Sequence, residues 1–151
     1  MPTETALSHK EFLQKVFRNL RMSTDAALSI LQKTKEETLK SSLTVQISTY
    51  EAFAARATEL MQREHIEPSD ENPFAKWTAK MGIQWNTLKD PTAPHLAQMI
   101  LEGTTMAIGE MLRAIKAAEE SGLPQESIRF AQEVLSYQES IARDMQSYLK
   151  G

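Results

Sequence analysis

Three histidines and a group of carboxylates are the residues in this chain best suited to chemistry. His9, His65 and His95 are the only histidines, and cysteine is absent. A dinuclear iron or manganese site in a helical bundle needs a Glu from each of two helices and Glu-x-x-His from each of the other two. The residues three positions before the histidines are alanine, glutamine and threonine. The sequence therefore lacks this motif and predicts no cofactor, with iron or manganese as the alternative.

Several polar residues nevertheless fall on or beside apolar helical stripes. The first interpretation is a structural network that satisfies two amides, a phenol and one buried carboxylate. The alternative is a residual metal or small-ligand pocket built from hard oxygen ligands around Glu110. The predicted core network is Gln46, Tyr50, Glu110 and Gln138, and the candidate metal ligands are Asp25, Glu51, Glu102 and Glu110.

Other kinds of chemistry have weaker support. The chain contains no Gly-x-Gly-x-x-Gly, Walker A or Gly-x-Ser-x-Gly motif. No mid-helix histidine is placed to act as a general base. The 17 basic and 20 acidic residues give a net charge of −3, and basic residues alternate with acidic ones, so we expect no nucleic-acid binding. The sequence predicts a non-catalytic protein.

Helix formers fill the segments between a few clusters of glycine and proline, which predicts an all-α protein. Ser8 and Glu11 have the spacing of a capping box, and Thr34 and Glu37 repeat it. The second helix should end near His65 and the third near Lys89. The five helices are expected to start at Ser8, after a turn near Lys33–Lys35, at Pro73, near Pro94 and at Pro124.

Four of these predicted helices would be roughly 40 Å long. The first and second, like the fourth and fifth, are joined by short turns, which makes each pair antiparallel. The short third helix falls where a long connection is needed. We therefore expect residues 1–151 to form one domain: a ferritin-like, up-down four-helix bundle of two antiparallel hairpins with a short helix in the crossover.

Several stretches carry a resemblance to a known family. They are residues 79–88 (AKMGIQWNTL), His95, residues 97–100 (AQMI) and residues 101–108 (LEGTTMAI). With these the chain resembles an uncharacterised family of ferritin-like four-helix proteins of clostridia and related Firmicutes. The resemblance implies a ferritin-like fold and a bacterial, cytoplasmic protein, and it implies no activity.

The expected mode of action is through the protein surface, as a homo-oligomer such as a dimer, or as a partner-binding module. Trp77 and Trp85 lie two turns apart on one face of the third helix. They either anchor the crossover helix or form an interface, because buried aromatic residues dominate both. No apolar run approaches ~18 residues, and the polar N-terminus has no secretory h-region. We expect no membrane partner.

Overall fold

The computed structural model describes residues 6–68, 72–81 and 92–149, which form five helices and contain no strand. This confirms the predicted all-α class. The helices are α1 (His9–Leu31), α2 (Glu37–Arg63), α3 (Pro73–Met81), α4 (Ala93–Glu120) and α5 (Gln125–Leu149). The third helix was expected to continue to Lys89. Residues 82–91 lie outside the described part, as do Trp85 and the side chain of Trp77.

Local sequence explains most of the helix ends. The Ser8 hydroxyl accepts a hydrogen bond from the Glu11 amide at 3.0 Å, and the Glu11 carboxylate accepts one from the Ser8 amide, which confirms the capping box. Gly122 ends α4 with a φ of 67°, a left-handed conformation that glycine adopts without strain. The start of α2 differs from the prediction. Glu36 is its N-cap, and Thr34 instead accepts a hydrogen bond from the Glu36 amide.

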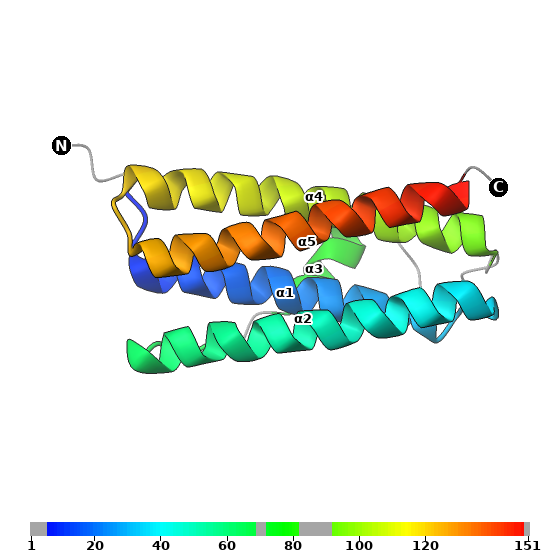
Figure 1. The fold of residues 1–151 in the computed structure, drawn as a ribbon, viewed down its shortest axis with the longest axis horizontal. Helices are drawn as coiled ribbons and strands as arrows, with labels where there is room; N and C mark the ends of the chain where they lie inside the picture. The colour runs from blue at the N-terminus through cyan, green and yellow to red at the C-terminus, as the bar shows by residue number, and fades with distance from the viewer. Residues whose placement is uncertain (1–5, 69–71, 82–91, 150–151) are drawn as a thin grey trace.

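The four long helices lie side by side, with α3 packed against α1 (Figure 1). Short turns join α1 to α2 and α4 to α5, and the helices of each pair pack against one another. The two pairs meet mainly where α1 contacts α4. α2 ends at one end of the molecule and α4 begins at the opposite end (Figure 1). The segment between them, which contains α3, must therefore join opposite ends.

The apolar core is divided along its length. One cluster of buried side chains includes Phe12, Leu13, Met61 and Phe130, and a second cluster nearer the other end includes Leu39, Leu43, Leu96, Ile141 and Met145. Between these two clusters lie the buried polar residues Asn19, Gln46, Thr104 and Gln138. This set is called the polar layer below. It lies where the four long helices run together midway along the molecule.

Aromatic contacts and ion pairs connect α2 to α5. The rings of Tyr50 and Tyr137 meet edge to face, with their centroids 5.4 Å apart. Phe53 contacts Phe130 in a similar way at 6.1 Å. Two ion pairs lie further along the same seam, Arg56 with Glu133 at 2.6 Å and Arg63 with Glu126 at 2.9 Å. The contacts described here between α2 and α5 are therefore made by long or aromatic side chains.

Candidate functional site

Three of the four residues predicted for the core network are buried in the structure. Gln46, Tyr50 and Gln138 are 1%, 2% and 0% exposed. Burial raises the pKa of the Tyr50 phenol above its ordinary value, and the neighbouring Tyr137 adds to this effect while Ser23 opposes it. Tyr50 therefore stays neutral at physiological pH and packs as a core residue.

Asn19 is hydrogen-bonded to one of these residues, Gln138, although the sequence did not point to Asn19. Its Oδ1 accepts a hydrogen bond from Gln138 Nε2 at 2.7 Å, and its Nδ2 donates to the Ala107 carbonyl at 3.0 Å. The three residues come from α5, α1 and α4, so the contacts join three helices. Asn19 lies three residues after the core residue Val16, and this helical spacing was the signal that could have identified it.

A small cavity opens beside the polar layer. Its volume is about 10 Å³, near the least that can hold one water molecule, and its polar lining comes from Ser23, Gln46, Tyr50 and Thr104. Within the described residues, Gln46 Nε2 and Gln138 Oε1 are buried without a hydrogen-bond partner. The centre of the core therefore contains unsatisfied amide groups, and the cavity beside them has no room for a ligand larger than water.

Glu110 does not belong to this layer, and its predicted place in the core is wrong. Glu110 is exposed on α4. The core-facing side of α4 is formed by Ala107, Met111 and Ala114, which are buried. Glu110 follows Met106 by one turn, and both line a groove on the surface of the molecule. Residues one turn apart share a side of a helix, so the apolar Met106 suggested that Glu110 faces the core. In the structure, that side of α4 faces the groove.

The other candidate metal ligands are dispersed. Glu51 and Glu102 are exposed, and Glu102 accepts a hydrogen bond from Gln98 at 2.9 Å. Asp25 is half-buried, and this burial raises the pKa of its carboxyl group while Arg21 partly opposes the rise. In the part of the chain that the structure describes, no three His, Asp or Glu side chains gather in a way that could hold a metal ion. The described residues therefore do not fit a dinuclear metal centre.

The groove beside Glu110 is the larger cavity, and its volume is about 580 Å³. It lies between α1 and α4 and reaches Pro73 and Lys76 of α3. Its apolar lining includes three methionines and two alanines, and Asn19 also contributes. The charged lining residues are Lys15, Arg18, Lys76, Arg113 and Glu110. Among the described lining residues, four side chains are therefore basic and one is acidic, around an apolar surface.

Two hydrogen bonds fix the register of α1 against α4. The Leu7 amide donates to Ser121 Oγ at 2.8 Å, and Asn19 Nδ2 donates to the Ala107 carbonyl. Because the two helices run in opposite directions, this register places Lys15 level with Arg113. Both side chains are exposed, and within the described residues no ion pair engages either of them. They stand on the two helices that form the walls of the groove.

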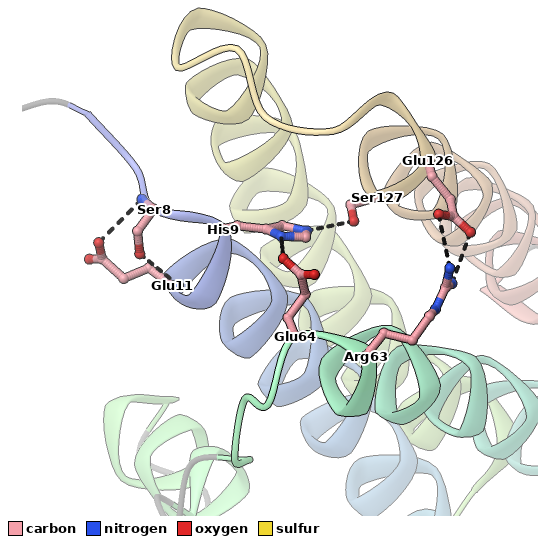
Figure 2. A network of polar contacts seen from close by, with 7 residues as sticks. All are labelled: Ser8, His9, Glu11, Arg63, Glu64, Glu126 and Ser127. Carbon is pink, nitrogen blue, oxygen red and sulfur yellow. Dashed lines mark hydrogen bonds and ion pairs between the residues drawn. The ribbon is translucent and has the colours of Figure 1, made fainter.

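A second polar arrangement lies at the end of the molecule where α1 and α5 begin and α2 ends (Figure 2). His9 Nδ1 lies 3.1 Å from a Glu64 carboxylate oxygen, and His9 Nε2 lies 2.7 Å from Ser127 Oγ. A neutral imidazole that donates from Nδ1 to Glu64 would accept the Ser127 hydroxyl proton at Nε2. The order serine, histidine, carboxylate is the order of a hydrolytic triad.

The burial of Ser127 indicates a structural role for this arrangement. Ser127 is 1% exposed, and it lines neither of the two cavities above. A nucleophile has to reach its substrate, whereas a buried hydroxyl can still tie one helix to another. Sequence reasoning placed His9 at a helix end but could not find these partners, because they lie 55 and 118 residues away in the chain.

Comparison with known proteins identifies no relative, since no protein-family model, curated protein or solved structure matches the chain. The resemblance to the ferritin-like family thus stays a prediction. Among the described helices, none combines the length and apolar character needed to cross a membrane. The groove between α1 and α4 is the larger of the two cavities described above.

Proposed function

We propose that this protein is a non-catalytic, ferritin-like four-helix bundle that acts by binding a small ligand in the groove between α1 and α4. The observation that carries the proposal is the groove itself, with its volume of about 580 Å³. Small-molecule sites have volumes of about 300–1,000 Å³, mostly apolar walls and a few polar groups that orient the ligand. The groove has all three properties.

The ferritin-like part of the proposal is supported by the order of the helices. Two antiparallel pairs and a connection that joins opposite ends of the molecule are typical of ferritin-like bundles. Such bundles hold their metal ions among inward-facing Glu and His side chains. Here the polar layer contains Asn19, Gln46 and Gln138 instead. An amide-filled layer favours binding on the bundle surface over metal chemistry in its interior.

The non-catalytic part is supported by the surroundings of His9. This histidine is engaged by Glu64 and Ser127, and the serine is inaccessible. The arrangement joins the beginnings of α1 and α5 to the end of α2, so it stabilises the end of the bundle. The described lining of the groove comes from Leu7 and from α1, α3 and α4, and it includes no histidine.

Nile red, a neutral dye that fluoresces in apolar surroundings, tests whether the groove binds ligands. Met106 and Ala117 line different parts of the groove and are only partly buried. We expect Met106→Trp and Ala117→Trp each to reduce dye binding, because the indole occupies the groove. Ala55 is exposed on α2, outside the groove, so Ala55→Trp is the matched control and should bind as the unchanged protein does.

Circular dichroism of each variant shows whether the fold is retained, and only folded variants are compared. The proposal is contradicted if the unchanged protein binds no dye, or if the groove variants bind it as well as the Ala55→Trp control. Light scattering on the same samples measures the mass of the particle in solution. It tests the predicted homo-oligomer independently. A dimer that dissociates when dye binds would show that a second copy occupies the groove, and it would overturn the small-ligand proposal.

A further inference from the structure

We infer that the ligand of the groove is a single-chain amphipathic anion, with its acidic head between Lys15 and Arg113 and its apolar tail along the methionines. This inference rests on the proposed function and specifies the chemical class of the ligand. The evidence for this class is the sign and position of the charges around the groove. The volume of the groove alone says nothing about the charge of its ligand.

The position of the acidic head follows from the register of α1 and α4. Lys15 and Arg113 stand level with one another on opposite walls. The Arg113 guanidinium lies beside Gly109, where an added Cβ would be 3.5 Å from Arg113 Nη1. An added Cβ at this distance would make an ordinary van der Waals contact, so the guanidinium packs beside α4 whether or not this residue is glycine. Two cations that face one another across an apolar surface repel, and an anion placed between them removes this repulsion.

The surrounding charges favour the same sign of ligand. Arg18 and Lys76 add positive charge to the groove lining, and Glu110 is the acidic residue among the described lining residues. Glu11 lies one turn before Lys15 at the exposed start of α1 and attracts its ammonium group. These two carboxylates oppose the positive charge of the basic residues among the described lining residues. A cationic ligand would be repelled by Lys15 and Arg113, which no ion pair engages among the described residues.

The apolar tail is matched to the rest of the lining. Met22, Met106 and Met111 lie on the two facing helices. Met22 and Met111 are 6% and 1% exposed, whereas Met106 is only partly buried. Met106 is therefore the methionine whose unbranched, polarizable side chain can adapt to tails of different shape. A methylene group buried on such a surface strengthens binding by about fourfold. The volume of about 580 Å³ suits one small molecule, which favours a free single-chain anion as the occupant.

Displacement of Nile red by three defined probes tests this inference. The probes are dodecanoate, the shorter anion octanoate and the cation dodecyltrimethylammonium, each used below its micelle concentration. We expect dodecanoate to displace the dye at lower concentration than either of the others. The comparison with octanoate measures the tail, and the comparison with the cation measures the charge of the head. Added salt should weaken dodecanoate binding, because exposed charges are screened.

Charge-reversed variants locate the acidic head. Lys15→Glu and Arg113→Glu should each weaken dodecanoate binding about five- to tenfold, the range expected when an exposed attraction becomes a repulsion. Lys116→Glu makes the same change in net charge on α4, outside the groove lining, and should change binding less than twofold. Lys116→Glu should also bind Nile red as the unchanged protein does. For Lys15→Glu and Arg113→Glu the loss of dodecanoate binding should exceed any loss of Nile red binding, since the dye is neutral.

The results separate this inference from the proposed function. If Nile red binds in the groove while the anion and the cation displace it equally, the groove is a ligand site and the inference about charge is wrong. If Lys15→Glu and Lys116→Glu weaken dodecanoate binding equally, the proposed position of the acidic head is wrong. If the tryptophan variants leave dye binding unchanged, the proposed function itself fails.

Discussion

Two buried glutamines in the polar layer differ in their hydrogen bonding, so the same substitution should have opposite effects on stability. Gln46 is 1% exposed, and its Nε2 has no partner among the described residues. Gln138 is 0% exposed, and its Nε2 donates to Asn19 Oδ1 at 2.7 Å. Methionine resembles glutamine in length and lack of branching, so Gln→Met removes the amide while largely preserving the packing.

The expected magnitudes follow from the cost of leaving a buried polar group unsatisfied, about 1–3 kcal/mol. Gln46→Met removes such a group, and we expect the free energy of unfolding to rise by about 1 kcal/mol. The midpoint of thermal unfolding should rise by about 2–4 °C. Gln138→Met instead leaves Asn19 Oδ1 buried without its donor. Removal of Gln138 Oε1, itself without a partner, offsets part of this cost. We therefore expect Gln138→Met to lower stability by about 1–2 kcal/mol.

Urea unfolding followed by far-ultraviolet circular dichroism measures both effects, with the slope of the transition checked for constancy. Gln62 on α2 and Gln132 on α5 are exposed, so Gln62→Met and Gln132→Met are matched controls and should be nearly neutral. If Gln46→Met destabilises the protein as much as Gln138→Met does, the reasoning is refuted. That result would mean that a bound water satisfies Gln46 from the cavity of about 10 Å³.

Two further substitutions test other parts of the core. Burial raises the pKa of Asp25, so its ionised form is disfavoured in the folded state, and stability is lost as pH rises from about 3.9 through the folded pKa. Asp25→Asn should therefore stabilise the protein at pH 7 by roughly a few tenths of a kcal/mol. Urea unfolding measured at several pH values should show this gain vanish below pH ~3. A loss at neutral pH would show that attraction to Arg21 dominates. Ser127→Ala removes the buried hydroxyl that contacts His9 and should cost about 1 kcal/mol in thermal unfolding, whereas equal stability of this variant and the unchanged protein would exclude a structural role for that contact.

Much of the secondary structure follows from the sequence because helix ends depend on neighbouring residues. Ser8 and Glu11 satisfy one another's backbone groups within a single turn, and Gly122 ends α4 through its own φ. Helical spacing also predicted the burial of Gln46, Tyr50 and Gln138. Each of these features is decided by residues within a few positions of one another, so a linear sequence contains the required information.

Periodicity identifies the apolar side of a helix but does not say what each part of that side will face. Met106 and Glu110 lie one turn apart, and only the positions of α1 and α3 make their side of α4 a groove. The same limit applies to Asn19, whose partners belong to α4 and α5. Packing between helices determines these surroundings, and such packing joins residues that are distant in the chain.

Sequence alone therefore determined the helices, most of their ends and a large part of the core, because these depend on local hydrogen bonding and on a repeating apolar pattern. The tertiary structure decided where the chemistry of the side chains is brought together. It placed Lys15 level with Arg113 and His9 between Glu64 and Ser127. Both arrangements arise from the register of one helix against another, which side-chain packing sets over the whole length of the molecule.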